Sequence, residues 1–222
     1  MKLAALFSGG KDSVLALHEA AEQHDIVCLI TMVSKNPESY MFHTPNIHLT
    51  ALQAASLEIP QITFETAGEK EEELEDLKKA IVKAREQYQI GGIITGAIQS
   101  VYQASRIQKI CNDLDLKCIN PLWQRNQIDI LRELLDKKMK VIIVGVFAYP
   151  LEKEWLGKEM DEKVIEDLTA LQKSLKINPA GEGGEIETLV VDAPLFKRPI
   201  KIIKAEPVWD KDSGIYKIIE AI

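Results

Sequence analysis

The first half of the chain alternates short apolar runs with amphipathic segments. The apolar runs predict buried strands, at residues 3–7, 26–33, 61–64, 92–95 and 117–119. Between them, apolar residues recur at the spacing of a helix face, at residues 13–23, 49–57, 69–88 and 100–114. Such alternation predicts a parallel sheet covered by helices on both faces. With right-handed crossovers this is an α/β, doubly wound, Rossmann-like fold.

The pattern changes after Pro121-Leu122-Trp123. Helical spacing now recurs at residues 128–135 and 161–174. The remaining apolar runs predict strands, at residues 140–147, 187–191, 200–209 and 215–219. We therefore expect a smaller C-terminal α+β domain at residues 123–222, following a first domain at residues 1–122.

A glycine-rich turn follows the first predicted strand and opens the first predicted helix. Its residues are Ser8, Gly9, Gly10, Lys11, Asp12 and Ser13. Glycine lets a backbone approach an anion closely, and the unpaired amides of a helix N-terminus attract negative charge. The serine hydroxyls and the lysine ammonium can bind phosphate oxygens, and Asp12 can cap the helix or hold a magnesium ion. The turn therefore predicts a phosphate-binding loop, with a well-capped strand-to-helix turn as the alternative.

The net charge and the cysteines argue against nucleic-acid-binding, disulfide-rich and zinc-ribbon proteins. The formal net charge is −7, whereas proteins that grip long stretches of nucleic acid usually carry a basic surface, so no nucleic-acid partner is expected. The three cysteines, Cys28, Cys111 and Cys118, include no C-x-x-C pair, which argues against a disulfide framework or a zinc ribbon. The cysteine usage therefore predicts a cytoplasmic location. No apolar stretch is long enough to span a bilayer, so we expect no membrane partner.

Two motifs carry a resemblance to a known family. The segment 8–13 has the S-G-G-x-D-S signature of the PP-loop ATPases, which typically cleave ATP between the α and β phosphates and adenylate an oxygen of the substrate. The segment 181–196 closely resembles a stretch of the diphthine–ammonia ligase family. Shorter segments add to the resemblance, namely Gly96-Ala97-Ile98, Tyr102-Gln103, Arg106 and Pro121-Leu122-Trp123. The resemblance covers essentially the whole chain, in the compact, archaeal-type form.

This resemblance implies a ligase with a fold of the PP-loop/HUP type. The family amidates diphthine, a modified histidine on translation elongation factor 2, giving diphthamide, AMP and pyrophosphate through an acyl-adenylate. Residues 1–122 are then expected to bind ATP, and residues 123–222 to bind the substrate. ATP and Mg²⁺ are the implied cofactors, and elongation factor 2 is the implied protein substrate. No glutamine-amidotransferase domain is evident, so free ammonium is the implied nitrogen source.

The resemblance also assigns residues around the nucleotide. Lys11 is expected to act as a catalytic group through electrostatic help at the phosphates, and Asp12 to hold the metal. Backbone groups at Met32 are expected to meet adenine, with an ordinary strand end as the alternative. Gly96 ends the fourth predicted strand, where close approach of the nucleotide explains a glycine and a simple turn is the alternative.

A second group of residues is expected to bind the substrate. Its members are Tyr102, Gln103, Arg106, Glu182, Gly183, Gly184, Glu185, Glu187 and Thr188. Gln103 and Arg106 share a helical face by their spacing, and Arg106 can either clamp an anion or form a surface ion pair. The three glutamates suit the trimethylammonium group of diphthine, and Glu185 is the expected catalytic group for the ammonium proton. An acidic surface loop is the alternative, and the division of roles among the glutamates stays open.

Other interpretations remain open at this stage. A tRNA-modifying PP-loop ATP pyrophosphatase is disfavoured by the acidic charge and by the lack of a catalytic cysteine set. A nucleotide-binding sensor without catalysis is permitted because a fold does not fix a function. A homo-oligomer is compatible with the sequence. We expect His18 and His24 at the surface of the first helix, and His43 and His48 lack a third nearby ligand for a metal.

Overall fold

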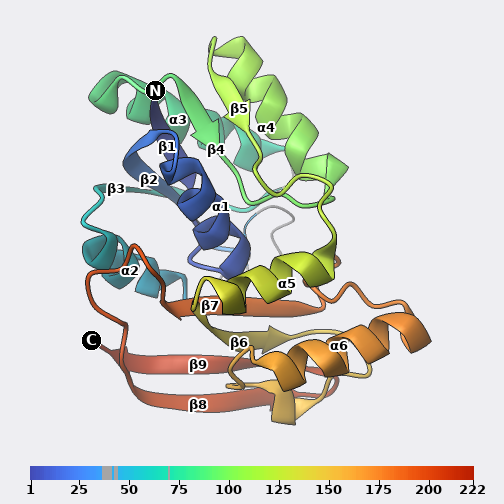
Figure 1. Ribbon diagram of the computed structural model, residues 1–222. Coiled ribbons are helices and arrows are strands. Elements are labelled where there is room, and N and C mark those ends of the chain that lie inside the picture. Colours follow the sequence, from blue (N-terminus) through green and yellow to red (C-terminus); the bar gives the residue numbers. More distant parts are fainter. Residues whose placement is uncertain (37–41, 43–44, 70) are drawn as a thin grey trace.

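The first half of the chain folds into a five-stranded parallel sheet (Figure 1). The computed structural model describes residues 1–36, 42, 45–69 and 71–222. The strands lie in the order β3-β2-β1-β4-β5, and their bounds are β1 Lys2–Leu6, β2 Asp25–Ser34, β3 Gln61–Thr66, β4 Gly92–Ile94 and β5 Lys117–Ile119. Central β1 pairs with β2 and β4, so that Ala5 lies between Leu29 and Ile94. The predicted doubly wound parallel sheet is therefore confirmed.

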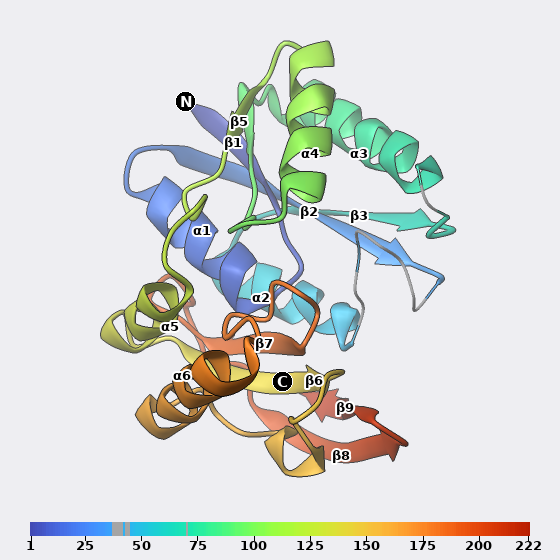
Figure 2. The same ribbon diagram turned by 90° about the vertical axis from the view of Figure 1, so that its right-hand side faces the viewer.

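Helices cover both faces of this sheet. They are α1 Lys11–Ala21, the short helix η1 Ile47–Leu49, α2 Thr50–Leu57, α3 Glu72–Tyr88 and α4 Val101–Asp113. Alternate residues of β1 point to opposite faces, since Leu3 and Ala5 join one apolar cluster and Ala4 joins another. The cluster around Ala4 contains residues of α3 and α4, and the other contains residues of α1 and α2 (Figure 2). No helix of the described residues is long and apolar enough to cross a membrane.

The second half forms a smaller unit around an antiparallel sheet. Its strand order is β7-β6-β9-β8, and its elements are α5 Gln127–Asp136, β6 Lys140–Val146, the short helix η2 Lys153–Trp155, α6 Glu162–Leu175, β7 Ile186–Asp192, β8 Ile202–Asp210 and β9 Ser213–Ala221. This confirms the predicted C-terminal α+β architecture. The boundary expected at residues 122/123 falls between β5 and α5.

A continuous apolar core joins the two halves. The cluster that contains Leu15 of α1 also contains Leu131 of α5, Ile143 of β6 and Val190 of β7. Helices α1 and α2 therefore lie on the side of the parallel sheet that faces the antiparallel sheet (Figure 1). As a result, β7 runs beside the turn between β1 and α1, where the phosphate loop was predicted.

Helix α2 turns a polar face toward this core. Thr50, Gln53 and Ser56 are each at most 3% exposed, and their spacing of three residues places them on one side of the helix. The Thr50 hydroxyl accepts a hydrogen bond from Gln61 Nε2 at 2.9 Å. The Ser56 hydroxyl accepts one from the backbone N–H of Arg198 at 3.2 Å, which fastens α2 to the linker between β7 and β8.

The expected surface position of His18 is wrong. Its side chain is buried, with Nδ1 2.8 Å from the carbonyl oxygen of Val14. Its Nε2 accepts a hydrogen bond from the backbone N–H of Leu195 at 3.1 Å. The linker after β7 thus covers this face of α1, and nothing in the local spacing of the helix indicates that a segment so distant in sequence would do so.

The burial of His18 predicts a loss of stability at acidic pH. Burial lowers the pKa of His18 from its ordinary value of about 6.5, so the fold favours the neutral ring. The stabilisation is fully present above the unfolded-state pKa and is lost as the pH falls below it. We expect the melting temperature of the wild type to fall between about pH 6.5 and 5 more steeply than that of His18→Gln. Equal slopes in thermal denaturation would contradict this.

Candidate functional site

The phosphate loop is a tight turn held by its own hydroxyl groups. Gly9 has a φ of +79°, a conformation that side chains disfavour. The Ser8 hydroxyl donates to the Ser13 hydroxyl at 3.3 Å, and the latter donates to the carbonyl oxygen of Gly10 at 3.0 Å. The backbone amides that open α1 follow directly. The turn therefore combines a shape that only glycine accepts easily with an N-terminus suited to phosphate.

Lys11 and Asp12 lie at the start of α1 and contact each other. Lys11 is 2% exposed, and its Nζ donates to Asp12 Oδ2 at 2.8 Å and to the carbonyl oxygen of Ala180. Burial raises the pKa of Asp12, although the neighbouring Lys11 opposes this effect. Within the described ranges, Asp12 Oδ1 is buried without a hydrogen-bond partner. A buried, unpaired carboxylate oxygen is costly unless a cation or a donor joins it, so this atom fits a metal ligand.

Asp12 does not belong to a larger cluster of metal-binding side chains in the described part of the chain. No three His, Cys, Asp or Glu side chains converge there in a group that could hold an ion. Mg²⁺ usually keeps several waters and binds through one or two carboxylates plus phosphate oxygens. Asp12 alone is therefore compatible with a magnesium ion that arrives with a nucleotide. His43 lies outside the described residues.

Gly96 follows the end of β4 and lies against the start of α1, and Met32 lies near the end of β2. A Cβ on Gly96 would be 2.7 Å from the carbonyl carbon of Asp12 and 2.8 Å from the backbone nitrogen of Ser13. The close approach that requires this glycine is therefore that of the α1 backbone itself. Met32 is 5% exposed and packs in the core with α3, which leaves only its backbone for a nucleotide.

The glutamates of residues 182–185 fold their own loop and fasten it to α4. Glu182 Oε2 accepts from the backbone N–H groups of Gln99 and Ser100 at 3.0 and 3.1 Å. Glu185 Oε1 accepts from the backbone N–H and the side-chain Nδ2 of Asn178 at 2.9 and 2.8 Å. Its Oε2 accepts from the backbone N–H of Gly183 at 2.8 Å. These contacts hold the acidic loop, residues 178–185, against the N-terminus of α4.

Strand β7 begins directly after the acidic loop and is hydrogen-bonded to the phosphate loop. The Thr188 hydroxyl accepts a hydrogen bond from the backbone N–H of Lys11 at 3.1 Å. A Cβ on Gly10 would lie 3.2 Å from the carbonyl oxygen of Thr188. Glu187 follows the acidic loop on the same strand and pairs with Gly145 of β6. The predicted nucleotide residues and the predicted acidic residues thus meet in one place.

The predicted residues of α4 form a separate surface group. The Arg106 guanidinium lies 3.5 Å from the centroid of the Tyr102 ring, and its Nη2 donates to Glu71 Oε1 at 2.8 Å. The backbone N–H of Gln103 donates to the Ser100 hydroxyl at 3.4 Å, which caps the helix. This is the geometry of the surface ion pair that the sequence left as an alternative, and a substrate role for these residues stays a prediction.

Two buried glutamines, Gln53 and Gln127, support the site, and the sequence indicated neither of them. Gln53 donates to the carbonyl oxygen of Gly9 at 2.9 Å. Gln127 Oε1 accepts from the backbone N–H of Ala180 at 3.0 Å, and its Nε2 donates to Gln99 Oε1 at 3.0 Å. Their partners are remote in sequence, so the spacing of residues within each helix does not reveal them.

Comparison with known proteins identifies the family. Family models described as the diphthamide synthase N-terminal and C-terminal domains match residues 1–118 and 126–222. The diphthine–ammonia ligase of Mus musculus is 36% identical, over 94% of this chain and 85% of its own. The chain belongs to the diphthine–ammonia ligase family. The Homo sapiens diphthine–ammonia ligase is 34% identical with the same coverage, and that of Schizosaccharomyces pombe is 32% identical over 94% of this chain and 37% of its own.

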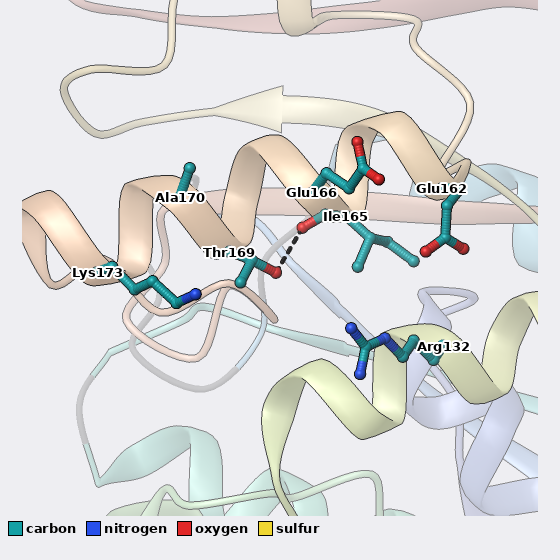
Figure 3. Close-up of a pocket in the computed structure, with 7 residues that line it drawn as sticks. All are labelled: Arg132, Glu162, Ile165, Glu166, Thr169, Ala170 and Lys173. Atoms are coloured by element: carbon teal, nitrogen blue, oxygen red, sulfur yellow. Dashed lines mark hydrogen bonds between the residues drawn. The ribbon is translucent and has the colours of Figure 1, made fainter.

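A groove between α5 and α6 lies away from the phosphate loop and the acidic loop. It has a volume of about 230 Å³. Arg132 of α5 faces Glu162 and Glu166 of α6 across it (Figure 3). None of its lining residues belongs to the phosphate loop or the acidic loop, so the groove is not part of the candidate active site.

Proposed function

We propose that this chain is an ATP-dependent ligase that amidates diphthine on translation elongation factor 2 with ammonium. The products are diphthamide, AMP and pyrophosphate. One observation carries the proposal: the strand that belongs to the family-specific segment is hydrogen-bonded to the phosphate loop, through Thr188 to Lys11 and through the N–H of Val190 to the carbonyl of Gly9 at 3.0 Å. A nucleotide on the loop and an acceptor beside β7 then share one site.

The chemistry requires activation of the acceptor carboxylate. A carboxylate is a poor electrophile, because its charge repels nucleophiles and oxide is a poor leaving group. Attack of its oxygen on the α-phosphate gives an acyl-adenylate and releases pyrophosphate, and ammonia then displaces AMP. The loop amides and the serine hydroxyls would bind the departing pyrophosphate and orient the nucleotide. Mg²⁺ held by Asp12 would neutralise phosphate charge.

Lys11 and Glu185 are the groups to which we assign catalytic roles. The Lys11 ammonium is held by Asp12 and Ala180, and its positive charge therefore stays at the phosphate loop. Glu185 accepts three hydrogen bonds, and a carboxylate has about four lone-pair sites. One more donor, such as ammonium, can therefore bind Glu185 and give it a proton. Glu182 and Glu187 lie nearby in sequence and suit the trimethylammonium group of diphthine.

A reconstituted reaction tests the proposal. Purified protein is mixed with ATP, Mg²⁺, ammonium and elongation factor 2 that bears diphthine, and AMP, pyrophosphate and the mass of the acceptor are measured. We expect AMP to form in equal amount to converted acceptor, and only when acceptor and ammonium are both present. Elongation factor 2 with an unmodified histidine is the matched control.

Other outcomes of the reconstituted reaction would support a different function. AMP formation without a change in the acceptor would indicate another carboxylate substrate. Salt-sensitive tRNA binding without amidation would favour the tRNA-modifying alternative, and ATP binding without turnover would favour the sensor. We also propose a cytoplasmic location, because the proposed substrate is a translation factor. A size measurement of the same preparation tests whether the protein is a homo-oligomer.

A further inference from the structure

Gln53 is a buried polar side chain that the proposed reaction does not use. It lies on α2 with 0% of its surface exposed. Its Nε2 donates two hydrogen bonds, to the carbonyl oxygen of Gly9 at 2.9 Å and to that of Val190 at 2.7 Å. The first carbonyl belongs to the phosphate loop and the second to β7, so a single amide group joins the two.

The same amide also fixes the shape of the phosphate loop. The Gly9 carbonyl accepts a second hydrogen bond, from the N–H of Val190 at 3.0 Å. A Cβ on Gly9 would lie 2.1 Å from Gln53 Oε1, so the side chain packs directly against the turn. Among the described residues, that oxygen has no hydrogen-bond partner. A buried amide that leaves one atom unpaired is costly, so the contribution of this side chain lies in its two donated bonds.

We propose that Gln53 is a positioning residue that holds the phosphate loop in register with β7. The proposal rests on the function proposed above, since β7 leads from the acidic loop to the nucleotide. Adenylation requires the α-phosphate and the acceptor carboxylate to meet in one geometry, and a displacement of about 1 Å can cost about 100-fold in rate. Gln53 controls that geometry through the Gly9 carbonyl and touches neither substrate.

Ser56 provides a matched control on the same helix. It is also 0% exposed and lies three residues further along the polar face of α2. Its hydroxyl is hydrogen-bonded to the backbone of Arg198 in the linker after β7. Removing either side chain costs a buried hydrogen bond, but only Gln53 contacts the phosphate loop.

The test compares Gln53→Leu with Ser56→Ala and the wild type. The dissociation constant of ATP is measured by calorimetry, and kcat and the KM for ATP are measured in the amidation assay, at a temperature where all three proteins are folded. We expect Gln53→Leu to bind ATP roughly tenfold more weakly and to lose kcat as well. Ser56→Ala should melt at a lower temperature yet stay within about twofold of the wild type in both constants, because it lies off the loop.

Two results would overturn the inference. One is a Gln53→Leu protein with wild-type ATP affinity and kcat, and the other is an equal loss in Ser56→Ala. If the leucine variant does not fold, Gln53→Met carries the test, because methionine is unbranched and of similar size and its thioether has no hydrogen to donate to the two carbonyls. Failure of the proposed function would appear differently, as a wild type that binds ATP without amidating diphthine, and the ATP affinities would still decide the role of Gln53.

Discussion

Replacing Asp12 with asparagine should abolish most of the ATP turnover in a protein that still folds. The change removes the buried carboxylate oxygen that has no partner within the described ranges, and with it the expected metal ligand. Loss of one such electrostatic contact typically costs about 10² to 10³ in kcat. AMP formation under saturating ATP and Mg²⁺ is the measurement. A variant with wild-type turnover would remove Asp12 from the nucleotide site.

The stability of the same variant is a second readout. Burial raises the pKa of Asp12, so its stabilising contribution is present below the unfolded-state pKa and is lost as the pH rises through the folded-state pKa. At neutral pH the ionised group is therefore a cost that asparagine lacks. Asparagine also removes the ion-pair partner of the buried Lys11, so the informative readout is the difference between the two proteins as the pH changes. We expect the melting temperature of the wild type to fall relative to that of Asp12→Asn as the pH rises from about 4 to 7. Asp129→Asn is the control, since Asp129 also lies in the first turn of a helix but is exposed.

Replacing Glu185 with alanine should impair amidation while ATP still binds. The carboxylate accepts three hydrogen bonds that order the acidic loop, and it is our candidate acceptor of the ammonium proton. General base catalysis typically contributes 10² to 10⁴ in rate, so we expect amidation to fall by roughly 100-fold or more. Diphthamide formation is measured by mass, and ATP affinity is measured separately.

Two further variants separate a chemical role of Glu185 from a structural one. Glu185→Gln keeps one oxygen to accept from Asn178 but cannot accept a proton, so it should lose amidation as fully as the alanine variant. Glu166→Ala removes an exposed carboxylate from the remote groove and should leave the rate unchanged. If Glu185→Gln were fully active, the carboxylate would serve only to order the loop.

The order of elements was predictable because each has a strong local signal. Apolar runs and helical spacing located every main strand and helix, and the glycine-rich turn lies where a phosphate loop was expected. The two short helices η1 and η2 were missed, since three residues give no periodicity.

The sequence also did not predict the contacts between segments that lie far apart along the chain. His18, Gln53 and Gln127 are polar residues whose partners are backbone groups of distant segments, and no spacing rule describes such a pair.

Gly96 illustrates a prediction whose physical reason had to come from the structure. The sequence predicted a glycine where a nucleotide comes close, whereas the structure shows the backbone of Asp12 and Ser13 at that position. Arg106 illustrates the reverse case. Its type and spacing allowed an anion clamp, but the available carboxylate of Glu71 lies within 2.8 Å, and a local pattern cannot choose between an internal and an external partner.

The phosphate loop covers strand β7, and this contact limits how the chain can be divided into separate fragments. Strand β7 is the last strand on its side of the antiparallel sheet, and Gly9 and Gln53 occupy backbone groups along it. A bare edge strand is a template for pairing with other chains and promotes aggregation. A fragment made of the C-terminal half alone would expose that edge together with the apolar surface beneath it. We therefore expect the two halves to stay monodisperse when they are expressed together. The C-terminal half prepared alone should aggregate.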